Sequence, residues 1–203
     1  MECPSSRAAD KLQEAVIISG FGGQGILLAG RLLAHAAMLA GREVTLMPAY
    51  GAEVRGGASN CTVVIATGPI ASPVISFPDC VVALSKAALS KFARAVKPGG
   101  CLLYNNCLAE RDPQMDATVL ALGIPADRLA LDLGGVKAAN MVMMGAYLQT
   151  RGVLDLDVVL RALPSVLGPR RQNTIPLNTR ALQAGAEYAR SVTEAPSRPV
   201  RRG

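Results

Sequence analysis

Residues 15–25 read A-V-I-I-S-G-F-G-G-Q-G, and this stretch decides the fold. It begins with a short apolar run of the kind that lies in a strand covered on both faces. Glycines follow at positions 20, 22, 23 and 25 in the pattern G-x-G-x-x-G, and residues 26–40 then read as a buried helix that Gly41 ends. A strand, a glycine loop and a helix in this order predict an α/β domain. The loop lets the backbone approach an anion at the N-terminus of the helix.

The rest of the chain continues the alternation of strands and helices. Further strands are predicted at 43–47, 60–66, 80–84 and 101–104, and further helices at 86–96, 125–131, 137–150, 155–163 and 178–192. Pro48 and Pro164 are expected to end the strand and the helix that precede them. The alternation indicates a parallel or mixed sheet with helices on both faces. We expect a polar lead over 1–14, one domain over 15–192, and a basic, disordered tail over 193–203.

The composition excludes several classes of protein. The 203 residues are 50% hydrophobic and 18% charged, which provides a sizeable core and excludes a disordered chain. The net charge of +6 is scattered apart from Arg170, Arg171 and the tail, and aromatic residues are only 3%, so a nucleic-acid-binding surface is not expected. The longest uncharged stretch, 56–78, is broken by Gly, Pro, Ser and Asn and does not fit a membrane span. We therefore expect a soluble, cytoplasmic protein without a membrane or nucleic-acid partner.

The cysteines and the single histidine offer little catalytic chemistry. No C-x-x-C pair occurs, so neither a zinc ribbon nor an iron–sulfur cradle is predicted, and reduced thiols are expected at Cys3, Cys61, Cys80, Cys101 and Cys107. His35 is expected at the edge of the first helix rather than as a base. Since no Ser-His-Asp or Cys-His arrangement is available, we predict neither a catalytic residue nor a metal site in this chain.

The glycine loop alone does not predict a nicotinamide site. Such a site needs a carboxylate at the end of the second strand to hold the ribose, and that strand ends in Met47-Pro48-Ala49. Two interpretations remain open. The glycines let the helix pack closely on its strand, or they let the backbone approach a phosphate-bearing ligand such as a nucleotide or coenzyme A.

A second glycine-rich motif follows the second strand. Residues 48–60 read P-A-Y-G-A-E-V-R-G-G-A-S-N, with Glu53 and Arg55 framed by glycines. Arg55 offers a rigid fork for a carboxylate or phosphate, and Glu53 could orient it or meet a basic group of a partner. The pattern fits a constrained recognition loop; the alternative is a tight turn with an exposed ion pair, which contributes little.

Together, G-F-G-G-Q-G at 20–25 and Y-G-A-E-V-R-G-G at 50–57 closely resemble the gamma subunit of 2-oxoacid:ferredoxin (acceptor) oxidoreductases. The likeness extends over about 15–189 and continues through N-C-T at 60–62, A-S-P at 71–73, K-P-G-G at 97–100 and N-M at 140–141. It implies a Rossmann-like three-layer sandwich with a mostly parallel sheet and the glycine loop after the first strand. It also implies a domain that works only inside a multi-subunit enzyme.

In that family a 2-oxoacid, coenzyme A and an oxidised acceptor become acyl-CoA, carbon dioxide and a reduced acceptor. The resemblance implies that thiamine diphosphate and magnesium belong to alpha and beta subunits, that [4Fe–4S] clusters belong to partner chains including a ferredoxin-like delta subunit, and that ferredoxin accepts the electrons. Coenzyme A is implied as co-substrate, close to Gly22, Gly23, Gln24 and Gly25. An interface loop is implied at Tyr50, Gly51, Glu53, Arg55, Gly56, Gly57 and Asn60.

The branch of the family is suggested by small differences. Indolepyruvate enzymes usually carry a His-Gly-x-x-Gln-Arg-Gly-Gly pattern, whereas this chain has Tyr50 and Glu53. S-N-C-T at 59–62 with A-S-P at 71–73 looks most like the 2-oxoglutarate branch, with the pyruvate and branched-chain branches as alternatives. A stand-alone nucleotide-binding oxidoreductase and a pure interaction module are the other hypotheses.

Overall fold

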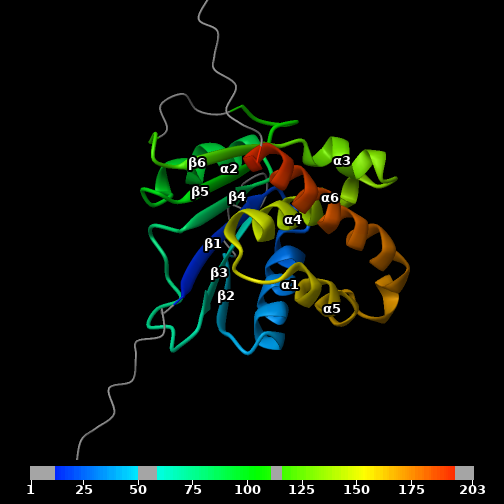
Figure 1. Ribbon diagram of the computed structural model, residues 1–203, viewed down its shortest axis with the longest axis horizontal. Helices are drawn as coiled ribbons and strands as arrows, with labels where there is room; N and C mark the ends of the chain where they lie inside the picture. Colours follow the sequence, from blue (N-terminus) through cyan, green and yellow to red (C-terminus); the bar gives the residue numbers. More distant parts are fainter. Residues whose placement is uncertain (1–11, 50–58, 111–115, 195–203) are drawn as a thin grey trace, which may run out of the picture.

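The computed structural model describes residues 12–49, 59–110 and 116–194, and it is built on one mixed sheet (Figure 1). The sheet order is β2-β3-β1-β4-β5-β6. Its strands are β1 (Gln13–Gly20), β2 (Glu43–Ala49), β3 (Ser59–Ala66), β4 (Cys80–Ala83), β5 (Cys101–Asn105) and β6 (Leu120–Ile124). Strands β1, β4, β5 and β6 pair in parallel, whereas β3 is antiparallel to both of its neighbours. The predicted α/β class with a mostly parallel sheet is confirmed.

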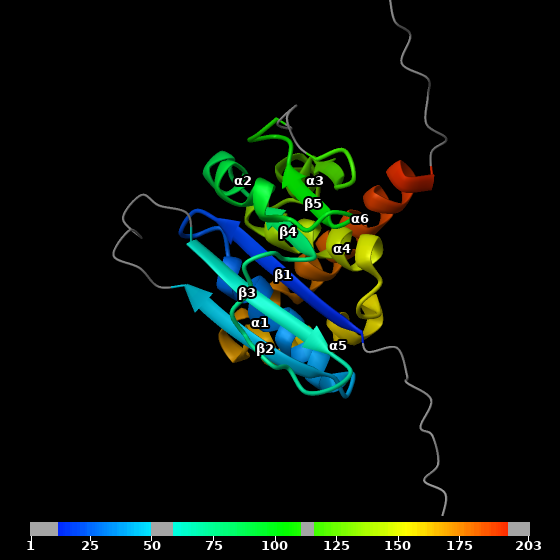
Figure 2. The same cartoon turned by 90° about the vertical axis from the view of Figure 1, so that its left-hand side faces the viewer.

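The helices are distributed unevenly over the two faces of the sheet. They are α1 (Ile26–Leu39), α2 (Lys86–Phe92), α3 (Ala126–Asp132), α4 (Ala139–Arg151), α5 (Leu156–Leu167) and α6 (Ile175–Glu194), with single-turn 3-10 segments η2 (Ala93–Ala95) and η3 (Val136–Ala138) and the longer η4 (Pro169–Thr174). Figure 1 shows α1, α4, α5 and α6 together on one face. Helix α2 packs on the opposite face, where Ala88 and Leu89 meet Val81 and Leu102. Figure 2 shows β3 and β2 in front of α1, with no helix over them among the described residues.

Some element boundaries differ from the sequence prediction for physical reasons. Strand β2 continues through Pro48, because it lies at the edge of the sheet, where a residue without an N–H is tolerated. Helix α5 continues through Pro164 to Leu167. Strand β6 was not predicted, and β1 begins at Gln13, inside the segment expected to be a polar lead.

Small residues allow the helices to approach one another closely. Gly145 of α4 and Gly185 of α6 face each other's helix, and a Cβ at either position would overlap a backbone carbonyl of the other helix, that of Leu182 or Val142. Gly30 of α1 likewise leaves room for the Cys61 thiol of β3. The high content of Ala and Gly therefore supports close packing of helix on helix and of helix on sheet.

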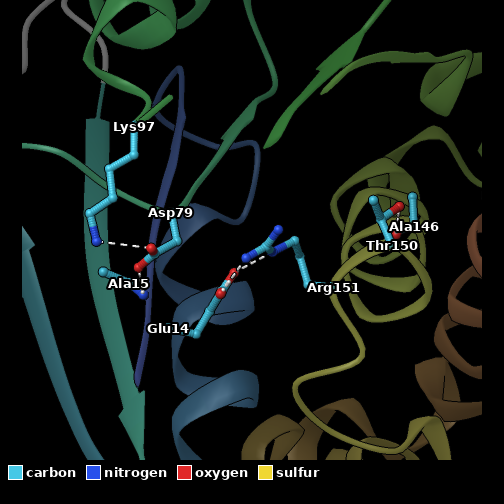
Figure 3. Close-up of polar contacts among 7 residues, drawn as sticks. All are labelled: Glu14, Ala15, Asp79, Lys97, Ala146, Thr150 and Arg151. Carbon is cyan, nitrogen blue, oxygen red and sulfur yellow. Dashed lines mark hydrogen bonds and ion pairs between the residues drawn. The ribbon is translucent and has the colours of Figure 1, made fainter. Parts of the chain in front are cut away.

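A partly buried ion pair joins the beginning of β1, at the end of this strand opposite to the glycine loop, to the end of α4 (Figure 3). The guanidinium of Arg151 donates from Nε and Nη2 to the two carboxylate oxygens of Glu14, each at 2.8 Å. Glu14 is only 4% exposed, and its hydrogen bonds raise the pKa of Arg151. Nearby, Asp79 accepts from the Ala15 amide and from Lys97 Nζ, both at 2.8 Å. These contacts anchor β1 to its surroundings.

Over the described ranges, none of the helices combines the length and the apolar character needed to cross a bilayer.

Candidate functional site

The glycine loop lies between two neighbouring parallel strands, β1 and β4, whose following helices pack on opposite faces of the sheet. After β1 the chain enters α1 on one face, and after β4 it enters α2 on the other face. In open α/β sheets, a ligand-binding crevice forms at this kind of position, beyond the carboxyl ends of the strands. Gly23 and Gly25 have φ values of +91° and +75°, which side chains with a Cβ rarely adopt. The loop conformation therefore requires glycine at both positions.

Gln24 fastens the loop to the neighbouring strand. Its Oε1 accepts from the Phe21 amide at 2.7 Å, and its Nε2 donates to the Leu84 carbonyl at 3.0 Å. A Cβ at Gly20 would collide with the Gln24 side chain and with Leu84, so this glycine is also required by packing. Gln24, predicted to lie close to the ligand, is part of the candidate site. Both atoms of its side-chain amide, however, form hydrogen bonds within the chain.

Asn140 clamps the other end of the loop. Its Nδ2 donates to the Gly25 carbonyl at 3.1 Å, and its Oδ1 accepts from the Met141 amide at 2.9 Å. A Cβ at Gly25 would collide with this amide. Asn140 is 3% exposed and joins α4 to the start of α1. Its role was missed from sequence, where N-M at 140–141 served only as part of the resemblance.

Gly22 is the one glycine of this loop that the protein's own structure does not explain. It is exposed, its φ is not positive, and a Cβ built on it meets no atom within 4 Å. Close approach of something outside the chain would account for a glycine at this position.

The last residues of the second motif lie beside the glycine loop, at the carboxyl end of β1. In the register of β1 and β3, Ser59 and Asn60 lie opposite Gly20 and Ser19, and the Ser19 hydroxyl donates to the Ser59 carbonyl at 3.1 Å. Asn60, the last predicted interface residue, is half-buried at this edge. The other predicted interface residues, Tyr50, Gly51, Glu53, Arg55, Gly56 and Gly57, lie outside the described residues.

The sheet order strengthens the argument against a nicotinamide site. At the glycine loop, β1 is flanked by β3, which begins there with Ser59 and Asn60, and by β4, which ends there at Ala83, whereas β2 lies one strand further away. None of these three residues carries the carboxylate that would hold a ribose.

The potential nucleophiles are not arranged for catalysis. Cys61, Cys80 and Cys101 are buried free thiols and Cys107 is an exposed one. Burial raises the pKa of the Cys61 thiol to about 12, which keeps it protonated. Within residues 12–49, 59–110 and 116–194, no three of His, Cys, Asp and Glu come together as a metal site. Among these residues, the glycine loop presents backbone without side chains, and no group of donors gathers beside it that could hold a metal ion.

Comparison with known proteins agrees with this architecture. The model of the pyruvate ferredoxin/flavodoxin oxidoreductase family matches residues 15–188. The chain is 41% identical over 180 residues to the ketoisovalerate oxidoreductase subunit VorA of Methanothermobacter thermautotrophicus, covering 88% of this chain but only 37% of VorA. It is 34% identical over 184 residues to the 2-oxoglutarate synthase subunit KorC of Methanocaldococcus jannaschii, covering 90% of this chain and 97% of KorC.

A solved structure gives the same result. The gamma subunit of a keto/oxoacid ferredoxin oxidoreductase from Geobacter sulfurreducens superposes with a TM-score of 0.76 and 31% identity, covering 88% of this chain and 99% of that subunit. The resemblance to gamma subunits that was inferred from the two glycine motifs is confirmed. The match over residues 15–188 and the full-length likeness to subunits of such oxidoreductases show that the chain belongs to the pyruvate ferredoxin/flavodoxin oxidoreductase family.

Proposed function

We propose that the chain is the gamma subunit of a 2-oxoacid:ferredoxin oxidoreductase, in which a 2-oxoacid and coenzyme A become acyl-CoA and carbon dioxide while oxidised ferredoxin accepts the electrons. The observation that carries this proposal is the pairing of Gly20, in the glycine loop, with Ser59, which directly follows the segment that contains the second motif. The family match supports it. The domain over 15–192 acts in the cytoplasm as one part of a complex.

In this proposal the redox chemistry belongs to partner subunits. Thiamine diphosphate and magnesium are held by the alpha and beta subunits, and [4Fe–4S] clusters by partner chains that include a ferredoxin-like delta subunit. The described residues of this chain bring together no set of donors that fits a metal or a cluster, so none of these groups is assigned to it. The chain supplies backbone and surface: Gly22, Gly23 and Gly25 line the approach of coenzyme A, and the Tyr50–Gly57 motif contacts a partner subunit.

We propose 2-oxoglutarate as the acid. The S-N-C-T motif at 59–62 and the likeness to KorC over 97% of its length support this choice. A branched-chain 2-oxoacid is the second candidate, because the VorA relative shares 41% identity, although the chain spans only 37% of that relative's length. Assays of the assembled enzyme with 2-oxoglutarate, 2-oxoisovalerate and pyruvate separate these branches by their kcat/KM values.

The Gly22→Ala variant is expected to keep the stability of the chain and to raise the KM for coenzyme A. The added Cβ meets nothing in the protein, so the Tm should move by no more than about 2 °C. A ligand held close to the backbone would be displaced, at a cost of about tenfold in KM. Gly68→Ala, also in open space but away from the loop, is the matched control. An unchanged KM would show that Gly22 does not approach coenzyme A.

The Arg55→Ala variant is expected to weaken assembly with the alpha and beta subunits and to leave the melting temperature of the isolated chain nearly unchanged. The reason is that the guanidinium is proposed to bind a carboxylate or phosphate of a partner rather than this chain. Co-purification of tagged wild-type and variant chains with co-expressed partners measures the loss. A large fall in the melting temperature together with normal assembly would contradict the proposal. It would mean that Arg55 stabilises the fold of this chain instead of binding a partner.

A further inference from the structure

Two thiols lie side by side at the beginning of two neighbouring parallel strands. Cys80 is the first residue of β4 and Cys101 is the first residue of β5, and they are partners in the register of these strands. Both side chains are buried in the core on the α4 side of the sheet. Because they are register partners on the same face, the two thiols are direct neighbours.

The spacing of the two backbones fits a disulfide. Neighbouring strands of a sheet lie about 4.8 Å apart, and cysteines joined by a disulfide have Cα atoms about 4.4–6.8 Å apart. The Cys101 amide donates to the carbonyl of Asp79 at 2.9 Å, which holds the two strands at this spacing where the cysteines lie. Rotation about χ1 can then bring the two sulfur atoms to bonding distance.

The surroundings of the pair favour a thiolate at Cys101. The hydrogen bond from Cys80 lowers the pKa of Cys101, and the Arg151 cation acts in the same direction, against burial and the Glu14 carboxylate. Burial, and then the same hydrogen bond, raises the pKa of Cys80. The pair therefore combines one sulfur with thiolate character and one protonated neighbour, as in cysteine pairs that react with oxidants.

The pair lies at the rim of the sheet, at the end of the strands opposite to the glycine loop. The chain enters β4 through Asp79, whose side chain is 20% exposed, and it enters β5 after the exposed residues 97–99. Access to the sulfur atoms requires separation of the first residues of two strands, and such local opening costs less than global unfolding. A small oxidant can reach the thiols by this route.

We propose that Cys80 and Cys101 form a reversible disulfide when the chain meets hydrogen peroxide. The Cys101 thiolate attacks one peroxide oxygen, the O–O bond breaks, and Cys101 becomes a sulfenic acid while hydroxide leaves. The Cys80 sulfur then attacks the sulfenic sulfur, an S–S bond forms, and the sulfenic oxygen leaves as water with the Cys80 proton. Hydroxide takes up the proton that Cys101 released, so two thiols and one peroxide give one disulfide and two waters.

The disulfide has two consequences for the chain. It closes a loop that contains α2 and η2, and so ties this segment to the sheet. It also consumes the sulfenic acid before a second peroxide converts it irreversibly to a sulfinic acid. Neither consequence depends on the proposed function.

Peptide mapping of the full folded chain by mass spectrometry tests the proposal, after treatment with hydrogen peroxide and alkylation of the remaining thiols. We expect cross-linked peptides in which fragmentation places the bond between Cys80 and Cys101, and we expect dithiothreitol to release them. The exposed thiol of Cys107 is the internal reference, because its oxidation shows that the peroxide has acted. If Cys80 and Cys101 are both alkylated after Cys107 has been oxidised, the proposal is wrong.

The Cys80→Ser variant tests the order of the two steps. It is expected to lose the cross-link and to accumulate a sulfenic acid at Cys101, which dimedone labels, whereas the wild type is not labelled there. Cys61→Ser is the matched control, because Cys61 is also buried but lies on β3, two strands away from β4, and its loss should leave the cross-link intact. A bond from Cys101 to Cys107 in place of Cys80 would overturn the proposal. The wild-type map decides the question even if Cys80→Ser fails to fold.

Discussion

The Gly145→Val variant is expected to lose at least about 3 kcal/mol of its free energy of unfolding, because it forces α4 and α6 apart. A Cβ at Gly145 overlaps the Leu182 carbonyl, and one at Gly185 overlaps the Val142 carbonyl. These atoms belong to helix backbones, which cannot move aside as a flexible side chain does. The Gly185→Val variant is expected to lose a similar part of its free energy of unfolding.

Urea denaturation of purified variants measures this effect. Gly68→Val is the matched control, because it introduces the same side chain where a Cβ meets no atom within 4 Å. It should stay within about 0.5 kcal/mol of the wild type. If Gly145→Val unfolds at the wild-type urea concentration, the two helices are not in backbone contact and the packing described here is wrong.

The Arg151→Met variant is expected to destabilise the chain by about 3–5 kcal/mol, because it leaves the Glu14 carboxylate buried without its counter-charge. Both oxygens of this carboxylate accept from Arg151 at 2.8 Å, and the Glu14 side chain is only 6% exposed. Removing the cation therefore leaves a charged group with its desolvation penalty uncompensated.

The Glu14→Leu/Arg151→Met double variant shows whether the unpaired charge is the cause. It should recover much of the lost stability, because both charges are then absent. Lys97→Met serves as the control: its side chain is 47% exposed in the pair with Asp79, so its loss should cost less than about 1 kcal/mol. A double variant as unstable as Arg151→Met would mean that lost packing, and not an unpaired charge, destabilises the protein.

The fold could be predicted where the sequence pattern is local. The run over 15–25 defined β1, the glycine loop and the start of α1, and Gly152 ends α4 with φ at +60° as expected of a C-cap. Strand β6 could not be recognised, because L-A-L-G-I contains a glycine and only one β-branched residue. The extent of β2 through Pro48 depends on its place at the edge of the sheet, which a local pattern does not reveal.

The candidate site was only partly predictable. The glycine loop was found from its spacing, but the hydrogen bond from Gln24 to Leu84 joins residues 60 positions apart, so the internal use of Gln24 was not visible. The contact of Asn140 with Gly25 likewise depends on how α4 packs beside the start of α1. The basic pair Arg170 and Arg171 was noticed as a cluster, but nothing in the sequence indicated that it lines a cavity together with Gly23 and Gly25.

The central claim is that this chain contributes to a 2-oxoacid oxidoreductase as a subunit and does not act alone. The most direct test is coenzyme A-dependent reduction of ferredoxin by 2-oxoacids, measured with the chain alone, with its co-expressed alpha, beta and delta partners, and with those partners lacking it. We predict turnover only when the chain and its partners are combined. Turnover by the isolated chain, or full activity of the partners without it, would contradict the account.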